Sequence, residues 1–354
     1  MFCEAESDRE ADHRACMATA HLAFSAFHLF LKWSVRITIT GQVDAGKGEG
    51  MADTLRGVYS AVATPFTAEQ EVDETRLRSL VDRTIDAGIH GVVPCGSTGE
   101  FSTLTRTERE RVVEVVIEQA AGRVPVVPHT GACSTREAIG LSQHAERTGA
   151  AAIMVVAPYY EPFSTVETKR YYADIAGSVS IPVMAYNLPA ATGVNLTPAT
   201  LGELISDVPN LKYVKDTSGD FSAAARLIHE YGDIVSVFVG WDTLFLAALL
   251  EGAAGSVIGA ANVVPGQLVA VYDAVQQGDL ARARYLWKAL FPLMASFVSG
   301  GYTAAIKGAM DLIGFSGGPQ RSPGEEVDRD RREILRHSLK SLGFDPALRH
   351  NGAR

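Results

Sequence analysis

A lysine stands at the end of a short apolar segment, directly before a polar turn. The segment reads LKYVKDTSGDF from Leu211 to Phe221, and Lys215 closes its apolar part. Successive residues of a strand point to opposite sides, so Leu211, Tyr213 and Lys215 are predicted to share one face. An amine among apolar neighbours loses part of its preference for the charged form, and a neutral amine can form a Schiff base with a carbonyl compound. The segment alone is also typical of a solvated strand-end lysine.

Two more segments with chemically useful groups follow apolar runs. Gly96-Ser97-Thr98-Gly99 places two hydroxyls between glycines, and free amides ahead of a helix would help them to hold a carboxylate. Glycine and serine also form ordinary turns. Tyr186 ends another apolar run and could transfer a proton to and from a substrate. The alternative interpretation is that Tyr186 is a structural residue packed at the rim of the fold.

Eight short apolar runs alternate with helical patterns. The runs cover residues 58–64, 89–95, 125–130, 151–157, 181–186, 211–215, 234–239 and 255–258. Continuous apolar runs are typical of strands that are covered on both faces. Thr105 with Glu108, and Ser134 with Glu137, fit a helix N-cap and its partner three residues on. The repeat predicts a (β/α)8 TIM barrel. An open doubly wound sheet is the alternative, but no Gly-rich dinucleotide turn follows the first strand.

The chain divides into three parts. We place the barrel at residues 51–260 and a C-terminal helical extension at residues 261–345. Helices are predicted in the extension at residues 264–277, 280–297, 302–313 and 327–342.

Residues 1–50 do not match the rest of the chain. They begin with acidic residues, unlike a signal or transit peptide. Gly41 to Lys47 fits the GxxxxGK pattern of a phosphate-binding loop, but Gly48 stands where Ser or Thr should hold magnesium. We interpret the match as coincidental and expect a non-native or disordered extension, with translation starting at Met51. A nucleotide-binding protein is the rival interpretation, and it predicts that removing residues 1–50 abolishes activity.

Composition narrows the class of protein. Of 354 residues, 47% are hydrophobic and 21% are charged, with a net charge of −9. That charge argues against a nucleic-acid partner, which requires a basic face. The longest apolar patch of the first fifty residues is too short to cross a membrane. Four cysteines without a CxxC pair indicate a reducing compartment, so we expect a cytoplasmic protein.

A family resemblance rests on six motifs in a fixed order. They are GSTGEF, APYY, YNLPAATG, YVKDTSGDF, GWDTLF and GAAGSVIGAANVVP, between Gly57 and Leu342. In this order the chain resembles the dihydrodipicolinate synthase / N-acetylneuraminate lyase family. The resemblance implies a homotetramer of (β/α)8 barrels that uses no metal or organic cofactor. It also implies that the substrates are pyruvate, bound as a Schiff base, and an aldehyde.

The resemblance assigns roles to particular residues. Lys215 matches the Schiff-base lysine, Tyr186 the proton-shuttling tyrosine, and Ser97 and Thr98 the hydroxyl pair that holds the carboxylate and completes the proton relay. Tyr160 matches a tyrosine that, in the synthases, reaches into the site of a neighbouring subunit. The implied substrate-binding residues also include Gly96, Gly99, Asp242 and Ile258. A barrel that only binds a metabolite would need neither Lys215 nor Tyr186, and both are present.

The second substrate is predicted from departures from the family pattern. The synthases carry an arginine where this chain has Ala191, and a methyl group cannot replace a bidentate guanidinium. Sialic acid lyases have an Asp-Glu pair at Asp242-Thr243. The YNLPAATG loop is similar to that of 2-keto-3-deoxy sugar-acid aldolases. We therefore expect a pyruvate-releasing aldolase acting on a 4-hydroxy-2-oxo acid or a 2-keto-3-deoxy sugar acid. The alternatives are 4-hydroxy-tetrahydrodipicolinate synthase, N-acetylneuraminate lyase, and a hydratase-aldolase with Phe101 and Trp241 in an apolar pocket.

Overall fold

The computed structural model describes residues 55–161 and 163–344. Within them, parallel strands form one seven-stranded sheet. The strands are β1 (Gly57–Ala61), β2 (Gly91–Val93), β3 (Ile153–Val156), β4 (Val183–Asn187), β5 (Leu211–Asp216), β6 (Ser236–Val239) and β7 (Gly255–Ile258). Their order in the sheet is β2-β1-β7-β6-β5-β4-β3, so the first strand pairs with the last. The expected division of residues 1–50 from the barrel lies outside the described residues.

The predicted strand at residues 125–130 is not a regular strand. It makes single parallel bridges on each side, from Val126 to Val92 of β2 and from His129 to Met154 of β3. Pro125 and Pro128 have no N–H group, which interrupts a continuous ladder. Their carbonyls still accept hydrogen bonds from Val92 and Met154. The segment therefore fills the eighth position and closes the barrel, as the predicted fold class requires.

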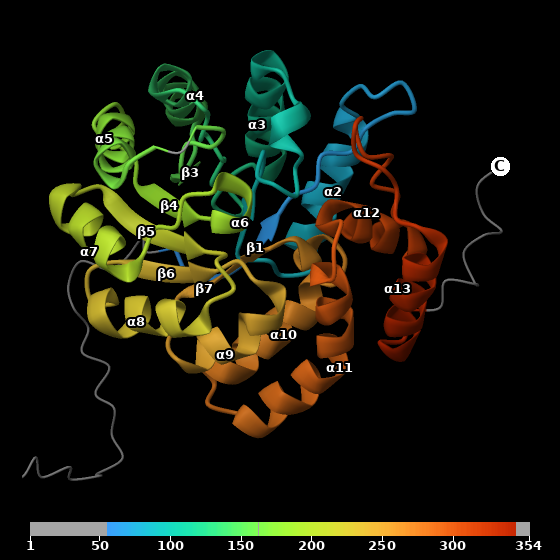
Figure 1. Ribbon diagram of the computed structural model, residues 1–354. Helices are drawn as coiled ribbons and strands as arrows, with labels where there is room; N and C mark the ends of the chain where they lie inside the picture. The colour runs from blue at the N-terminus through green and yellow to red at the C-terminus, as the bar shows by residue number, and fades with distance from the viewer. Residues whose placement is uncertain (1–54, 162, 345–354) are drawn as a thin grey trace, which may run out of the picture. The chain divides into compact units, whose positions relative to one another are not determined.

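Helices surround the strands, as Figure 1 shows. Their bounds are α2 (Glu74–Asp86), α3 (Arg106–Ala120), α4 (Thr135–Thr148), α5 (Thr165–Ala176), α6 (Pro189–Thr192), α7 (Pro198–Asp207), α8 (Phe221–Tyr231), α9 (Phe245–Leu250), α10 (Pro265–Gln276), α11 (Leu280–Val298), α12 (Tyr302–Leu312) and α13 (Arg329–Ser341). Short 3-10 turns lie at η1 (Phe101–Thr103), η2 (Asp242–Leu244) and η3 (Gly259–Asn262). Both predicted N-caps are confirmed, because Thr105 and Ser134 accept hydrogen bonds from the amides of Glu108 and Glu137.

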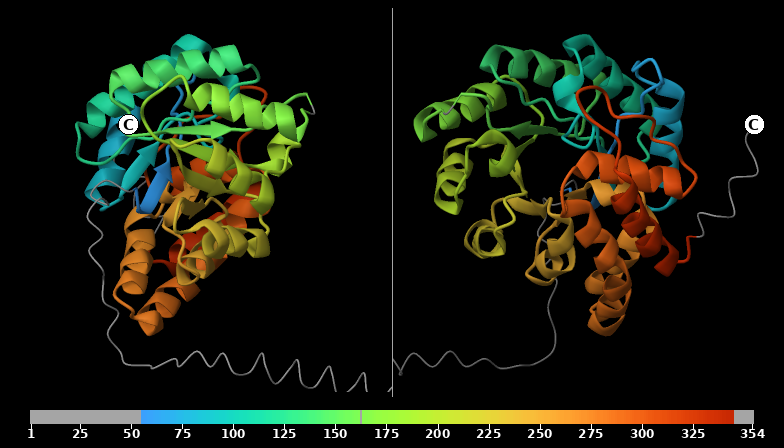
Figure 2. Two further views of the ribbon diagram at one scale, coloured as in Figure 1. Left: turned by 90° about the vertical axis from the view of Figure 1, so that its left-hand side faces the viewer. Right: turned by 45° about the vertical axis from the view of Figure 1, so that its right-hand side comes forward.

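The C-terminal helices complete and extend the ring. α10, which the sequence assigned to the extension, packs on β1. α11 packs on α9 and α10, α12 on η3, and α13 on α11 and α12. Figures 1 and 2 show these orange and red helices gathered on one side of the barrel. In the described part of the chain, no helix is long and apolar enough to cross a membrane.

Strand side chains form an inner and an outer layer. The inner cluster includes Tyr59, Met154, Met184, Tyr213 and Phe238. The outer cluster packs the other faces of the strands against the helices. Two packed layers fix each strand against rotation and sliding, which holds the residues at the strand ends in place.

The side of β5 predicted for its first residue, Leu211, is wrong. Leu211 lies in the outer cluster, whereas Tyr213 lies in the inner one. Val183 pairs with Leu211 and Met184 with Tyr213, which leaves the exposed Lys212 as a bulge. A bulge inserts one residue and reverses the alternation of sides. From Tyr213 onward the predicted alternation holds.

Candidate active site

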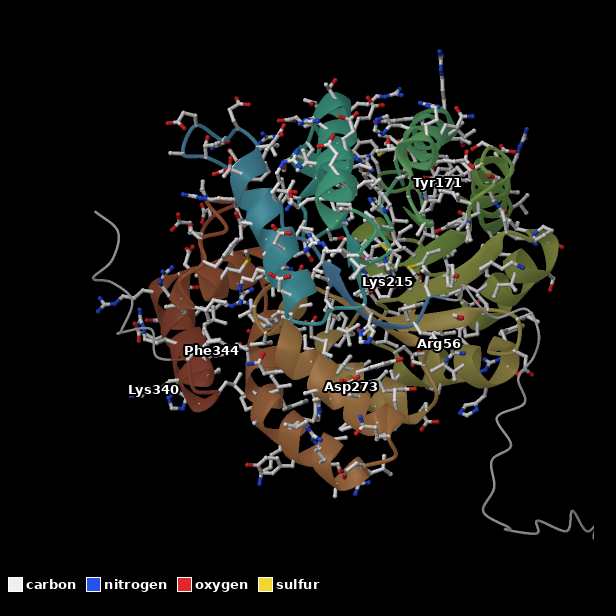
Figure 3. All side chains as sticks on the ribbon, turned by 180° about the vertical axis from the view of Figure 1, so that it is seen from behind. Arg56, Tyr171, Lys215, Asp273, Lys340 and Phe344 are labelled. Carbon is white, nitrogen blue, oxygen red and sulfur yellow. The ribbon has the colours of Figure 1, made fainter. Side chains whose placement is uncertain are left out.

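Lys215 lies near the carboxyl end of β5, with Tyr186 of β4 and Phe238 of β6 beside it in register. The lysine is 5% exposed, and its Nζ lies 4.0 Å from the centre of the Tyr186 ring. Among the described residues, Nζ makes no hydrogen bond or ion pair. Gly240 leaves room for the side chain, since a Cβ there would lie 2.6 Å from Lys215 Cε. Figure 3 shows Lys215 near the middle of the ring of helices. The amine is thus positioned by packing rather than by a counter-ion.

A cavity of about 210 Å³ opens beside this amine. It is lined by Ala61, Ser97, Thr98, Tyr186, Leu188, Lys215, Thr217, Gly240, Trp241, Asp242, Val257, Gly259, Val298 and Tyr302. Five of the predicted site residues therefore come together: the amine of Lys215, the phenol of Tyr186, the hydroxyls of Ser97 and Thr98, and the carboxyl of Asp242.

The turn after β2 presents its hydroxyls to the cavity. Ser97 is exposed and Thr98 is 4% exposed. Among the described residues, the amides of Ser97 and Thr98 donate no hydrogen bond, so they are free to bind an anion. Thr64 donates a 2.7 Å hydrogen bond to the Gly99 carbonyl. A Cβ on Gly99 would lie 3.0 Å from a backbone oxygen of the segment after β1, so glycine is needed for this close approach. The buried Gly96 precedes the two hydroxyls.

Tyr186 packs against His129, which in turn packs against Phe101. Its ring lies edge-to-face with His129, with 6.3 Å between the ring centres. His129 in turn packs against Phe101 at 4.5 Å. Phe101 does not line the cavity, whereas Trp241 does. The sequence pattern did not single out His129, because its segment was identified only as a strand.

Asp242 is buried and hydrogen-bonded. Its carboxylate accepts a 2.7 Å hydrogen bond from the Tyr302 hydroxyl and a 3.3 Å hydrogen bond from the Ala260 amide. The same hydroxyl accepts a 2.9 Å hydrogen bond from the Gly259 amide. Burial raises the pKa of Asp242 to about 6, although the Tyr302 hydrogen bond opposes that rise. The carboxyl therefore keeps its proton to a higher pH than an exposed aspartate does.

Two residues of the site come from helices that the sequence assigned to the extension. Tyr302 begins α12 and Val298 ends α11, and both line the cavity. No local pattern marks either residue, because only the packing of these helices on the barrel brings them to Lys215. The extension is thus part of the site.

Four predicted residues do not line the cavity: the turn glycines Gly96 and Gly99, and also Tyr160 and Ile258. Tyr160 is 91% exposed and does not line the cavity. Its predicted role depends on a second subunit and stays a prediction. The Ile258 side chain packs in the outer cluster with the helices, while its neighbours Val257 and Gly259 line the cavity. The predicted contact of Ile258 with substrate stays a prediction.

The groups in the cavity define a class of protein. Within residues 55–161 and 163–344, no group of three or more His, Cys, Asp or Glu side chains is placed to hold a metal ion. The cavity offers an amine, a phenol, two hydroxyls and a carboxyl at the carboxyl ends of parallel strands, where barrel enzymes carry their chemistry. A lysine in this setting is typical of enzymes that form a Schiff base with a carbonyl substrate.

Comparison with known proteins identifies the family. The sequence profile of the dihydrodipicolinate synthetase family matches residues 54–342. A 4-hydroxy-tetrahydrodipicolinate synthase of Methanopyrus kandleri is 39% identical over 84% of this chain and 99% of its own. An uncharacterized DapA-like lyase of Halobacterium salinarum is 36% identical over 84% of this chain and 97% of its own. The chain therefore belongs to the dihydrodipicolinate synthetase family, whose members are pyruvate-dependent lyases that form a Schiff base with a lysine.

Solved structures agree with this assignment. A dihydrodipicolinate synthase from Acinetobacter baumannii, complexed with pyruvate, superposes with a TM-score of 0.80 at 32% identity and covers 82% of this chain and 100% of that one. YagE from E. coli K12, also in complex with pyruvate, gives a TM-score of 0.78 at 33% identity and covers 82% of this chain and 99% of that one. The predicted barrel fold is confirmed.

Proposed function

We propose that Lys215 forms the Schiff base with C2 of pyruvate. The family chemistry requires a lysine, and Lys215 is a buried amine without a counter-ion that lines the cavity. The amine adds to the carbonyl carbon, and the ketone oxygen leaves as water. In cleavage the same imine forms at C2 of the 4-hydroxy-2-oxo acid, and the electron pair of the breaking C3–C4 bond moves into an enamine between C2 and C3, with the imine nitrogen as acceptor. Protonation of the enamine at C3 and hydrolysis of the imine then release pyruvate, and the reverse sequence forms the bond.

The neighbouring groups supply binding and proton transfer. We assign the carboxylate of the 2-oxo acid to the hydroxyls and amides of Ser97 and Thr98, which are preorganised by the turn that contains Gly99. We assign Tyr186 the transfer of a proton to and from the substrate oxygen at C4, through the hydroxyl relay of Thr98. The aldehyde leaves when that oxygen loses its proton and the C3–C4 bond breaks.

The second substrate is inferred to be an aldehyde without a carboxylate. Within the described part of the chain, no arginine lines the cavity, and its side chains next to α6 and η2 are the apolar Leu188 and Trp241. Ala191 lies in α6, in the loop where the synthases carry their arginine. A carboxylate there would lose its water shell without gaining a bidentate partner. We therefore favour cleavage of a 4-hydroxy-2-oxo acid or a 2-keto-3-deoxy sugar acid.

A synthase of lysine biosynthesis is the second candidate. It is supported by the names of curated relatives such as the Methanopyrus kandleri protein. The third candidate is a hydratase-aldolase acting on aromatic oxo acids. It is supported by Trp241, which lines the cavity, but not by Phe101, which packs on His129 and does not line the cavity.

Substrate competition separates these candidates. Pyruvate release from 2-keto-3-deoxygluconate and from simple 4-hydroxy-2-oxo acids is measured beside condensation of pyruvate with aspartate semialdehyde. We expect kcat/KM to be at least about 10-fold higher for a neutral aldehyde, the scale of one unmade charge-assisted contact. Ala191→Arg should move the preference toward aspartate semialdehyde. A wild-type enzyme that prefers aspartate semialdehyde would refute the proposed substrate class.

The family resemblance also leads us to propose a homotetramer in which Tyr160 contacts a neighbouring subunit. The observation that supports a contact is the 91% exposed tyrosine ring on a backbone with φ of 96°. A left-handed backbone is unfavourable for a tyrosine unless its surroundings impose it. Light scattering of the purified protein measures the assembly directly, and a monomer at micromolar concentration would contradict the proposal.

A further inference from the structure

His129 lies at the end of the segment that closes the barrel and is 2% exposed. Its Nδ1 lies 2.9 Å from the carbonyl oxygen of Cys95. Because a carbonyl oxygen only accepts, Nδ1 carries the proton and Nε2 keeps a lone pair. The Cys95 carbonyl immediately precedes Gly96. This hydrogen bond therefore fixes the backbone at the start of the turn that carries Ser97 and Thr98.

The imidazole is neutral, and only one of its two ring nitrogens has a hydrogen-bond partner in the described part of the chain. Burial, together with the positive charges of Arg109 and Lys215, lowers the pKa of His129 well below its ordinary value. Nε2 is buried and has no hydrogen-bond partner in the described part of the chain. A buried acceptor without a partner destabilises the fold. A phenyl ring would fill the same volume without that acceptor, so packing alone does not account for a histidine here.

The surroundings hold the ring in one orientation. Arg109 donates hydrogen bonds to the carbonyl oxygens of His129, at 2.9 Å, and Gly131, at 3.1 Å. The same guanidinium lies over the Phe101 ring at 5.2 Å. A Cβ on Gly131 would lie 2.9 Å from His129 Nε2, so glycine leaves room for the imidazole. The ring also packs edge-to-face with Tyr186.

These contacts connect the two halves of the site. One edge of the imidazole holds the backbone in front of the carboxylate-binding hydroxyls, and the ring supports the phenol of Tyr186. We propose that His129 is a positioning residue of the aldol reaction, with its N–H setting the affinity for the 2-oxo acid and its ring setting proton transfer by Tyr186. The inference rests on the proposed function and adds a residue to it.

Two substitutions separate the two contacts. His129→Phe keeps a ring of similar size and removes the N–H donor. His129→Asn can keep a donor near the Nδ1 position and removes the ring. Pyruvate KM should rise about 10-fold in the Phe variant with kcat within about 3-fold, whereas kcat should fall about 10-fold in the Asn variant with KM within about 3-fold. A residue with a merely structural role would not produce this split.

His144 provides a matched control. It lies on α4, where its Nε2 is 3.1 Å from a Glu114 carboxylate oxygen, away from the cavity. His144→Asn should leave both constants unchanged. Thermal unfolding of all variants is measured in parallel, and the Phe variant preserves the packed volume, so its KM decides the donor role even where the Asn variant does not fold.

The outcomes distinguish this inference from the proposed function. Borohydride trapping with pyruvate is first done on the wild-type enzyme. Absence of a Lys215 adduct would refute the proposed function itself. With the adduct present, unchanged constants in the Phe variant, or equal changes of kcat and KM in both variants, would overturn the role of His129. The predicted split would establish it.

Discussion

Two buried lysines lie in very different surroundings. Lys215 is 5% exposed and Lys307 is 3% exposed. Both lie over an aromatic ring, Tyr186 at 4.0 Å and Phe66 at 4.5 Å. Both also line a cavity, and the cavity beside Lys307 is the larger, at about 630 Å³ against about 210 Å³. Neither burial, nor an aromatic neighbour, nor the size of a cavity therefore distinguishes a reactive lysine from a structural one.

The partners of the two amines do distinguish them. Lys307 Nζ lies 2.5 Å from a carboxylate oxygen of Glu100 and donates a 2.8 Å hydrogen bond to the Pro319 carbonyl. Burial lowers the pKa of Lys307, and the charge of Glu100 opposes that change. Lys215 has no such partner among the described residues. The Lys307 amine is occupied by a carboxylate and a carbonyl, whereas an unpaired amine beside a cavity is open to a carbonyl carbon.

Lys307 has a structural function that reaches the site. Glu100 directly follows Gly99, at the end of the turn that carries the two hydroxyls. Its second carboxylate oxygen accepts a 3.0 Å hydrogen bond from the Arg321 amide. The Arg321 guanidinium donates hydrogen bonds to the Glu108 carboxylate. Glu100 and Lys307 thus hold the linker before α13 against the turn that carries Ser97 and Thr98.

Exchanging the reactive lysine should give the largest effect. Lys215→Arg keeps the positive charge, but a guanidinium stays protonated and cannot form the imine. We expect kcat/KM to fall at least about 1,000-fold with a folded protein, since the nucleophile is removed. Steady-state pyruvate release and circular dichroism measure the two properties. Turnover close to that of the wild type would remove Lys215 from the mechanism.

Exchanging the structural lysine should act on stability instead. Lys307→Met leaves the Glu100 carboxylate buried without its counter-ion, which should lower the free energy of unfolding by about 3–5 kcal/mol. The double variant Glu100→Gln, Lys307→Met should recover most of that loss. Urea unfolding measures both, and the folded fraction should still trap pyruvate. A stable Lys307→Met enzyme that no longer forms the imine would reverse the roles given to the two lysines.

The phenol beside Lys215 should matter for turnover but not for folding. Tyr186→Phe keeps the ring under the amine and removes the hydroxyl, which makes no hydrogen bond in the described part of the chain. Turnover should fall about 100-fold, the usual range for general acid–base groups. The free energy of unfolding should stay within about 1 kcal/mol of the wild type. Unchanged turnover would assign proton transfer to another group.

The smallest expected effect is a pH dependence of stability caused by Asp242. Its pKa is raised to about 6, and the charge of Lys215 is among the groups that limit the rise. Between about pH 4 and pH 6 the folded protein therefore binds a proton that the unfolded chain has lost, so stability falls as pH rises through that window. Relative to Asp242→Asn, the wild type should lose roughly 2–3 kcal/mol across it. Unfolding curves of both proteins are measured at pH 4.5 and at pH 7. An equal difference in unfolding free energy between wild type and Asp242→Asn at the two pH values would contradict the assigned pKa.

Local sequence signals predicted much of the scaffold. The N-caps Thr105 and Ser134 depend on residues three positions away, and the sequence located both. The irregular segment at 125–130 could have been foreseen from Pro125 and Pro128, because each removes a backbone donor. The reversed Leu211 could not, because the bulge arises from pairing with β4.

The missed parts of the site are those that depend on distant packing. Tyr302 is 60 residues from Asp242 in the sequence, yet the two form a 2.7 Å hydrogen bond. Only the docking of α12 on the barrel creates that contact. His129 was missed because its segment carries no motif. The role proposed for it depends on contacts with three residues distant in sequence, Cys95, Phe101 and Tyr186. Motifs located the proposed nucleophile, whereas tertiary structure supplied the groups that surround it.

Borohydride trapping with pyruvate, followed by peptide mass mapping, tests the assignment of the two lysines most directly. Reduction of an imine fixes pyruvate covalently to the amine that formed it. We predict one reduced adduct on Lys215 and none on Lys307, with full loss of the adduct in Lys215→Arg. An adduct on Lys307 or on any other lysine, with Lys215 unmodified in folded protein, would contradict the conclusion that an unpaired amine at the end of β5 carries the chemistry.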